Sequence, residues 1–251
     1  MSTLLRPVLS IIHIIYTIYI LIKTQWFYLN NEIIRLINPK SLKLNECILN
    51  ECDTSGLKKL PGHLIVVIGS ENVSFVDIIK IIGWTVALGI PHVSFYDQDG
   101  VIKKQSNEFK KEYQKSKPDS YPKITWDFDK LNNNKNETNS YKSTTKIHFL
   151  CYKDGKGNIV NLTKDIAQAV TLGVLKHEEI DSNLINEKLS YNFPEPDLAI
   201  VFGNTFSTFG LLPWHIRLTA FFHLPTHHNI PPKSFINVLA KYGGCEQRYG
   251  K

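Results

Sequence analysis

The sequence is poor in cysteine, and this excludes two classes of small protein. Four cysteines occur among 251 residues, and no two of them have the CxxC spacing. Cys47, Cys52, Cys151 and Cys245 are too few and too scattered for a disulfide scaffold or a zinc-finger site. We expect all four to be reduced thiols in a domain that faces the cytosol.

Nucleotide-binding and serine-hydrolase signatures are also missing. The patterns GxGxxG, GxxxxGK[ST] and GxSxG do not occur, and residues 69–72, which follow the first predicted strand, match none of them. His223 and His227 have the HxxxH spacing of a helical metal site, but Pro225 between them disfavours a helix. No cysteine or carboxylate stands near them in the sequence. We expect a histidine-rich loop there and no metal site.

No stripe of basic residues interleaved with aromatic residues runs through the chain, which argues against a nucleic-acid-binding surface. The formal net charge is +6, from 29 Lys and Arg and 23 Asp and Glu. The lysines are spread along segments of surface character. An excess of this size also suits a protein that lies near anionic lipid or handles diphosphates. We therefore expect no nucleic-acid partner.

One long apolar run is present near the N-terminus. Residues 7–29 are PVLSIIHIIYTIYILIKTQWFYL, with no charged residue from position 8 to position 22. A membrane-spanning helix needs about 20 apolar residues. Lys23 can extend its charge to the interface, where the aromatic group that begins at Trp26 is also typical. The run lacks the cleavage site of a signal peptide and is less two-faced than an interfacial helix, so we predict a membrane anchor over residues 1–30.

The charges on either side of this run predict its orientation. Arg6 precedes the run, whereas Lys23, Arg35, Lys40 and Lys43 lie at its end or beyond it. Positively charged residues accumulate on the cytoplasmic side of a membrane helix. The C-terminal part of this single-pass protein is therefore expected in the cytosol.

The rest of the chain alternates between strand-like and helix-like patterns after a polar linker over residues 31–60. Strands are predicted at residues 63–68, 92–97, 146–152 and 197–203. Helices are predicted to begin after Ser74, over 103–117, over 163–180 with Thr163 opening it, and from a cap at Ser234 toward Gln247. This order predicts an α/β domain over residues 61–251 with a mostly parallel sheet flanked by helices. Residues 129–145 are Asn-rich and are expected to form a disordered loop.

The last third of the chain carries the most specific pattern. It contains LLPWHIRLT at residues 211–219 and ends in Arg248-Tyr249-Gly250-Lys251. These segments, within residues 60–251 and behind an N-terminal apolar run, resemble the cis-prenyltransferase family. Within that family they are similar to the accessory subunits of the Nogo-B receptor type. The resemblance implies a fold like that of undecaprenyl diphosphate synthase, with an N-terminal membrane helix.

The chain departs from the catalytic members of that family at two places. Those members carry an aspartate in a DGN-type turn after the first strand, whereas this chain has Gly69-Ser70-Glu71-Asn72. They also carry an R-x-S-G-E-x-R-type segment that binds diphosphate, whereas residues 202–210 here contain no arginine. Charge-assisted hydrogen bonds from arginine are the strong way to hold a diphosphate. We therefore expect this chain to be inactive alone.

The resemblance implies a role shared with a catalytic partner in dehydrodolichyl diphosphate synthase, a heteromeric transferase. That complex adds isopentenyl diphosphate units to farnesyl diphosphate, which makes the dolichol precursor for protein glycosylation at the endoplasmic reticulum membrane. In this family the R-x-G motif of the tail enters the partner's active site. Arg248 is thus expected to bind isopentenyl diphosphate, and the backbone of Gly250 to lie against the partner's Mg²⁺. The Mg²⁺ cofactor is expected to be held mainly by the partner and by no side chain of this chain.

Three further residues, Trp214, His215 and Arg217, fall in the family's interface region, on a strand after a loop. Trp214 is expected to be a packing residue, and Arg217 to pair with an acidic residue either within the fold or across the interface. A second class of function stays open. The chain would then be a membrane-anchored receptor or scaffold with a degenerate prenyltransferase fold, for which Arg248 and Gly250 have no use.

Overall fold

The computed structural model describes residues 2–37, 54–116, 124–126 and 144–245. The elements in chain order are α1 (Ser2–Ile37), β1 (His63–Ile68), α3 (Phe75–Ala87), β2 (His92–Asp97), α4 (Val101–Lys104), α5 (Ser106–Ser116), β3 (Ile124–Trp126), β4 (Thr145–Leu150), α6 (Lys156–Thr171), the 3₁₀ helix η3 (His177–Glu179), α7 (Ser182–Leu189), β5 (Leu198–Phe202), β6 (Ala220–Leu224) and α8 (Pro232–Gly243). Strands and helices alternate through most of the domain.

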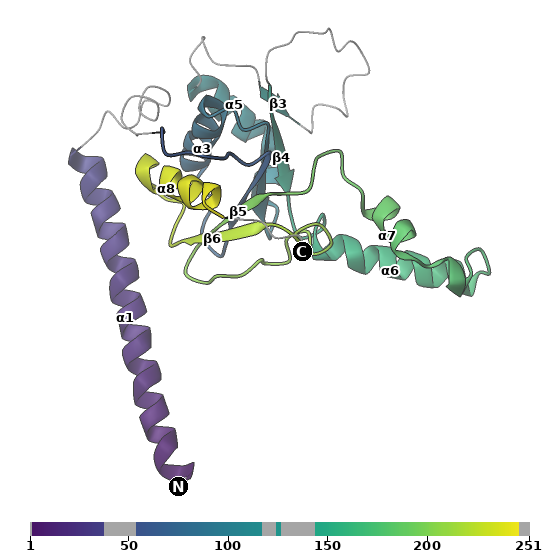
Figure 1. Cartoon of the computed structure of the whole chain (residues 1–251), viewed down its shortest axis with the longest axis horizontal. Coiled ribbons are helices and arrows are strands. Elements are labelled where there is room, and N and C mark those ends of the chain that lie inside the picture. Colours follow the sequence, from purple (N-terminus) through teal and green to yellow (C-terminus); the bar gives the residue numbers. More distant parts are fainter. Residues whose placement is uncertain (1, 38–53, 117–123, 127–143, 246–251) are drawn as a thin grey trace.

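The six strands form one parallel sheet in the order β3-β4-β2-β1-β5-β6 (Figure 1). β1 lies inside the sheet, where Leu64 pairs with Val93 of β2 on one side and with Leu198 of β5 on the other. Every residue of β1 is buried. A continuous apolar strand of this kind is typical of a parallel sheet that is covered on both faces. The predicted α/β class and parallel sheet are confirmed.

Two apolar clusters cover the two faces of this sheet. On one face, Leu64, Val66 and Ile68 pack with buried side chains of α3, α5 and α8. On the other face, Ile65 and Val67 pack mainly with the chain segment that follows β5. α6 and α7 extend away from the sheet in Figure 1, and Gly157 is the one buried residue of α6. Helices therefore cover the first face, whereas loop segments cover much of the second.

α3 begins as the sequence predicts. Ser74 has an extended backbone, and its Oγ accepts a hydrogen bond from the N–H of Asp77, which is an N-cap arrangement. Ile78 and Ile82, four residues apart on one side of the helix, are buried against the sheet. The helix is followed by Gly89, whose φ of 73° suits glycine at a helix end.

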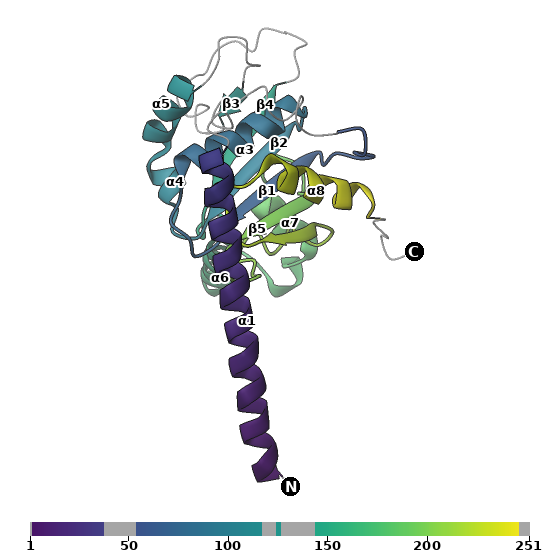
Figure 2. The same ribbon diagram turned by 90° about the vertical axis from the view of Figure 1, so that its left-hand side faces the viewer.

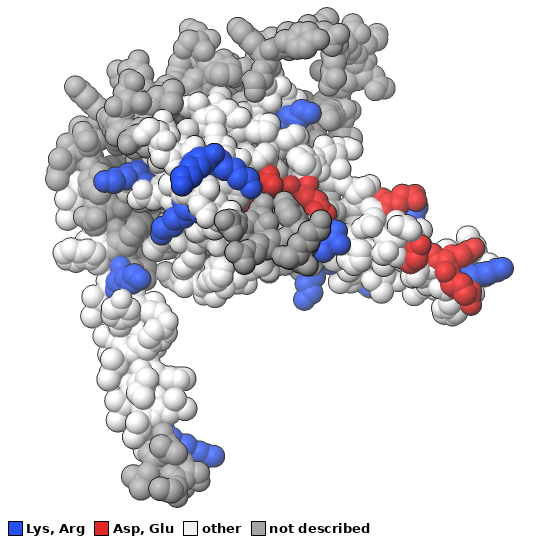
Figure 3. Space-filling view, viewed as in Figure 1, with Lys and Arg blue, Asp and Glu red and all other residues white. Residues whose placement is uncertain are grey.

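α1 is a single helix of 36 residues that extends far beyond the domain (Figures 1 and 2). At about 1.5 Å per residue it is about 54 Å long, which exceeds the ~30 Å hydrocarbon core of a bilayer. Its segment Arg6–Lys23 is long and apolar enough to cross a membrane, and none of that segment is buried. In Figure 3 this part of α1 is mostly white, with basic atoms near its two ends. The helix continues to Ile37, beyond the predicted boundary at residue 30.

The helix predicted at residues 163–180 was placed wrongly. α6 begins at Lys156, and Gly155 occupies its N-cap position. Thr163 lies inside α6, where its Oγ1 donates to the carbonyl oxygen of Ile159. Threonine hydroxyls often bond back in this way inside helices, so a threonine alone does not identify a helix start. α7, which follows after a turn at Gly173, was missed.

Of the two strands at the edges of the sheet, β3 was missed and β6 was misplaced. β3 has only three residues, which is too short for a clear pattern. β6 begins at Ala220, later than the strand predicted after the loop. Residues 214–217 precede β6, so Trp214, His215 and Arg217 are not on a strand as predicted.

The boundaries of two further segments differ from the prediction. α8 has Pro231 at its N-cap and Pro232 as its first residue, so Ser234 lies in the first turn and is not the cap. Thr145 already belongs to β4. Residues 129–143 of the predicted Asn-rich loop lie outside the described residues.

Three histidines of the inner strands lie together: His63 and His92 begin β1 and β2, and His148 lies within β4. His63 is fully buried, with its ring 5.9 Å from the ring of His92 and 6.2 Å from that of His148. Nδ1 of His63 donates to the carbonyl oxygen of Pro194 at 2.7 Å, so Nε2 accepts from the hydroxyl of Ser94 at 2.7 Å. Burial above all lowers the pKa of His63 from 6.5 to about 3; the hydrogen bond to Pro194 acts against this shift, and the two neighbouring histidines add to it. His63 is therefore neutral in the folded protein at neutral pH.

We predict that the folded protein loses stability as the pH falls from 6.5 toward about 3. In this range the unfolded chain binds a proton on His63 and the folded chain does not, so acid favours unfolding. One such group gives a slope of up to about 1.4 kcal/mol per pH unit. Urea unfolding of the full chain in detergent micelles at several pH values measures the slope. His63→Gln should flatten it relative to the exposed control His177→Gln, and equal slopes in the two variants would contradict the prediction.

Candidate functional site

The carboxyl ends of the six strands meet at one edge of the sheet, which is where open parallel α/β sheets bind their ligands. Residues 69–74 follow β1 at this edge, and residues 203–219 follow β5. Both departures from the catalytic sequence pattern fall on these two segments. This edge is therefore the candidate functional site.

The segment after β5 folds back over the end of β1. Phe209, with a φ of 51°, and Gly210, with a φ of 83°, turn the chain. The hydroxyl of Tyr96 donates to the carbonyl oxygen of Phe209 at 2.7 Å. A Cβ on Gly69 would lie 2.4 Å from the carbonyl oxygen of Phe202 and 3.2 Å from the ring of Phe209. Only glycine at position 69 allows this approach.

The same segment then covers the second face of the sheet. Leu211 and Leu212 are buried in the cluster that contains Ile65 and Val67. The carbonyl oxygen of Gly210 accepts a hydrogen bond from the N–H of Lys156 at the start of α6, at 2.8 Å. No residue from 203 to 212 is cationic. This segment therefore offers an anionic substrate no charged partner.

Glu71 connects the segment after β1 to the segment after β6. One oxygen of its carboxylate, Oε2, accepts from the hydroxyl of Thr226 at 3.0 Å and from the backbone N–H of His227 at 3.1 Å. The same oxygen lies 2.9 Å from Nδ1 of His227, whose side chain is fully buried. Glu71 therefore has a structural use, although it stands close to the position at which catalytic members carry an aspartate.

Glu71, His227 and His228 also form a group whose ligand atoms lie within 4.8 Å of one another, as in a metal site. The sequence prediction considered no carboxylate near these histidines, which was wrong because Glu71 lies 156 positions away from His227. Nε2 of His227 accepts from the backbone N–H of Ser74 at 3.1 Å. Its proton is therefore on Nδ1, which donates to Glu71. His227 keeps no lone pair for a metal in this arrangement, so the group fits a structural hydrogen-bond network better than a metal site.

Asp97, at the end of β2, is a second acidic side chain of this edge. It is buried, and its carboxylate accepts from the N–H groups of Val101 at 2.7 Å and Ile102 at 3.1 Å. Burial raises the pKa of Asp97. Its oxygens hold the start of α4 and are not directed to a ligand.

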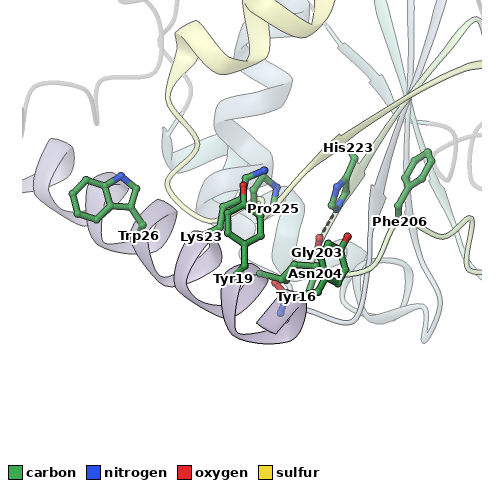
Figure 4. Close-up of a pocket in the computed structure, with 10 residues that line it drawn as sticks. Tyr16, Tyr19, Lys23, Trp26, Gly203, Asn204, Phe206, His223 and Pro225 are labelled. Atoms are coloured by element: carbon green, nitrogen blue, oxygen red, sulfur yellow. Dashed lines mark hydrogen bonds between the residues drawn. The ribbon is translucent and has the colours of Figure 1, made fainter. Parts of the chain in front are cut away.

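A cavity of about 660 Å³ lies between α1 and the ends of β5 and β6 (Figure 4). Its described lining residues are Tyr16, Tyr19, Ile20, Lys23 and Trp26 of α1, and Gly203, Asn204, Phe206, His223 and Pro225 of the domain. Sequence reasoning missed this cavity, because no pattern places residues 16–26 beside residues 203–225. The tyrosine and tryptophan residues at one end of the apolar run were the available signal.

Comparison with models of known protein families finds no match. The chain is 35% identical over 206 residues to the mouse (Mus musculus) dehydrodolichyl diphosphate synthase complex subunit Nus1, and the match covers 79% of this chain and 69% of that protein. The chain belongs to the NUS1 family of dehydrodolichyl diphosphate synthase complex subunits. It is also 30% identical over 231 residues to the NUS1 subunit of Saccharomyces cerevisiae, a match that covers 79% of this chain and 62% of that protein.

A solved structure supports the fold of this NUS1-family chain. Lavandulyl diphosphate synthase from Lavandula x intermedia, in complex with dimethylallyl diphosphate, superposes with a TM-score of 0.52. The match covers 76% of this chain and 98% of that one, at 16% identity. The resemblance to the cis-prenyltransferases is thereby confirmed at the level of fold.

Two of the predicted interface residues of this NUS1-family member contact α7 and the segment after it. Trp214 is half-buried, and its Nε1 donates to Oδ1 of Asn186 at 2.7 Å. The ring of His215 lies 5.0 Å from that of Tyr191, nearly edge to face. Burial lowers the pKa of His215. Trp214 thus forms a hydrogen bond within the chain, while its packing role and the interface role of both residues stay predictions.

Arg217 has an acidic neighbour within the chain. Its Nη2 lies 3.4 Å from Oε1 of Glu195, and both side chains are exposed. Arg217 therefore has an acidic partner within the fold, which is one of the two alternatives that the sequence left open; the other was an acidic residue across the interface. Arg248 and Gly250, the residues predicted to act at the partner's active site, lie outside the described residues. Their predicted roles therefore stay predictions.

We predict that Glu71→Ala lowers the free energy of unfolding by about 2–4 kcal/mol, because the two buried N–H groups of His227 lose their acceptor. Urea unfolding of the full chain in micelles measures the loss. Glu187→Ala, whose side chain is 75% exposed on α7, is the control and should change little. EDTA should not alter the stability of the unmodified protein. A loss of stability with EDTA, restored by a divalent metal, would contradict the hydrogen-bond assignment.

Proposed function

We propose that this chain is the membrane-anchored, non-catalytic but activity-essential subunit of dehydrodolichyl diphosphate synthase. Together with a catalytic cis-prenyltransferase subunit, it adds isopentenyl diphosphate units to farnesyl diphosphate and so makes the dolichol precursor for protein glycosylation. The proposal follows from membership of a family whose relatives are named as subunits of that complex. The observation that carries it is the closed carboxyl edge of the sheet.

The closed edge supports inactivity of the chain alone. Phe209 lies where the segment after β5 meets the end of β1, and this segment has no arginine. Glu71 and Asp97 already accept hydrogen bonds from the protein. A diphosphate and its Mg²⁺ need cationic donors and free carboxylate oxygens, respectively. In the proposed complex, the Mg²⁺ is therefore held mainly by residues of the partner, which also bind the allylic diphosphate.

The tail supplies what the sheet edge does not. Arg248 stands three residues beyond Cys245, the last described residue, and a chain of that length reaches about 10 Å. Its guanidinium offers paired donors that match the oxygens of isopentenyl diphosphate. Gly250, without a side chain, allows the main chain to lie close to phosphate oxygens and the partner's Mg²⁺. Trp214, His215 and Arg217 contribute to the surface that the partner contacts.

We propose that α1 anchors this subunit in the endoplasmic reticulum membrane. Its apolar segment Arg6–Lys23 crosses the bilayer once. The excess of basic residues after this segment puts the domain on the cytosolic side. A membrane location suits the reaction, because the long polyprenyl product is itself apolar and partitions into lipid.

We predict that polyprenyl synthesis requires both subunits. The full chain and a catalytic cis-prenyltransferase subunit are expressed separately and together, and incorporation of radiolabelled isopentenyl diphosphate with farnesyl diphosphate is measured in each membrane fraction. Activity should be near background for this chain alone and should rise strongly in the pair. Chain elongation by this protein alone would overturn the proposed role. A stable pair whose activity equals that of the partner alone would favour the scaffold hypothesis.

We predict that Arg248→Ala lowers kcat/KM of the pair for isopentenyl diphosphate by about 10- to 100-fold, because one charge-assisted hydrogen-bond group contributes about 1.5–3 kcal/mol. Arg248→Lys should retain part of the activity, since it keeps the charge without the paired donors. Lys164→Ala, which removes an exposed positive charge on α6, is the control for loss of one cationic side chain. Co-purification of the two subunits is measured for each variant. Unchanged turnover in Arg248→Ala would remove the tail from the mechanism.

A further inference from the structure

The cavity between α1 and the domain lies at the end of the apolar segment of α1. Lys23, which lines the cavity, is the last residue of that segment, and Tyr16 and Tyr19 lie within it. Trp26 lines the cavity one turn beyond the segment. Tyrosine, tryptophan and lysine gather where hydrocarbon meets the headgroups of a bilayer. With the segment in a membrane, the cavity therefore reaches from the level of the lipid headgroups, at Lys23 and Trp26, toward that of the hydrocarbon, at Tyr16 about 10 Å along α1.

The two walls of the cavity differ in chemistry (Figure 4). The α1 wall has aromatic rings and one full positive charge, at Lys23. On the domain wall, Phe206 is 59% exposed and its ring lies 5.7 Å from that of His223. No acidic side chain is among the described residues that line the cavity. An amphipathic ligand with a negative head and an apolar tail matches this lining.

His223 adds directional chemistry to the domain wall. Its Nε2 donates to the carbonyl oxygen of Gly203 at 2.6 Å, because a carbonyl oxygen can only accept. In this tautomer Nδ1 carries a lone pair and can accept a hydrogen bond from a protonated phosphate oxygen. Lys23 thus provides a positive charge, and His223 a directional hydrogen-bonding group, from opposite walls of the cavity.

We propose that this cavity binds the phosphate headgroup of a membrane lipid, with Lys23 and His223 on the phosphate and the tail of the lipid along the apolar side of α1. The volume of about 660 Å³ lies within the range of about 300–1,000 Å³ that is usual for small-ligand sites. Two sources share this chemistry: a glycerophospholipid and a polyisoprenoid phosphate. The proposal rests on the proposed membrane anchor and goes beyond it, because it assigns a lipid site to the contact between anchor and domain.

The test uses the full chain, co-purified with its catalytic partner and reconstituted in phosphatidylcholine nanodiscs. One set of nanodiscs contains a small share of phosphatidic acid, and a second contains the same share of polyprenyl monophosphate. Photoreactive benzoylphenylalanine replaces Tyr19 at the cavity or, as the matched control, Ile11 in the exposed apolar segment. After illumination, mass spectrometry identifies the lipid attached at each position.

At position 19 we expect the phosphate lipid in the adducts about tenfold above its share of the bilayer, as for one charge-assisted interaction. At position 11 the adducts should follow the bulk lipid composition. Lys23→Ala should abolish the enrichment and Lys23→Arg should keep it. Lys164→Ala, which removes an exposed lysine of α6, should have no effect.

The two sets of nanodiscs distinguish the sources of the phosphate. Enrichment of phosphatidic acid alone identifies a glycerophospholipid site, and enrichment of the polyprenyl phosphate identifies an isoprenoid site. Equal adducts at positions 19 and 11, or enrichment that survives Lys23→Ala, would overturn the proposal while leaving the anchor intact. Failure of the chain to enter nanodiscs would contradict the membrane anchor, and with it the lipid site.

Discussion

The close approach of Gly69 to the segment after β5 is the constraint on which the candidate site depends. A Cβ at this position would lie 2.4 Å from the carbonyl oxygen of Phe202, so a residue other than glycine would push the two segments apart. With glycine there, Phe209 lies over the end of β1, and the hydroxyl of Tyr96 holds its carbonyl oxygen. Leu211 and Leu212 then continue into the second apolar cluster. The edge at which a parallel α/β sheet ordinarily binds a ligand is thereby filled by the chain itself.

The acidic residues at this edge also bind groups of the chain itself. Glu71 joins the segments after β1 and β6 through Thr226 and His227, and Asp97 holds the first turn of α4. Removing a carboxylate from water costs free energy, and hydrogen bonds from protein N–H or O–H groups offset this cost for both side chains. Both carboxylates therefore stabilise the fold. Under the function proposed above, this NUS1-family subunit contributes to the shared reaction through parts other than its own sheet edge.

The membrane helix and the domain form one functional unit in this view. α1 is too exposed to be part of the domain core, and its apolar segment is long enough to cross a membrane. Its tyrosine, tryptophan and lysine residues lie beside the ends of β5 and β6, next to the closed edge. In the proposed membrane-anchored complex, the domain is thus held with that edge near the bilayer, where an apolar product collects. The same placement creates a cavity whose walls come from both parts of the chain.

The sequence by itself determined the apolar helix, the inner parallel strands and the family. Every side chain of the continuous apolar run 63–68 is buried, and such a run indicates an inner strand of a parallel sheet. The segment 211–219 pointed to the family to which the relatives belong. The sequence did not reveal β3, because three residues are too few for a periodic signal, and it placed β6 too early in the chain. It also missed the start of α6, because Thr163 bonds within the helix. Only the tertiary structure brought Glu71 to His227, closed Phe209 over Gly69, and placed residues 16–26 beside His223. Such contacts join positions far apart in the chain, and local patterns carry no information about which distant segments meet.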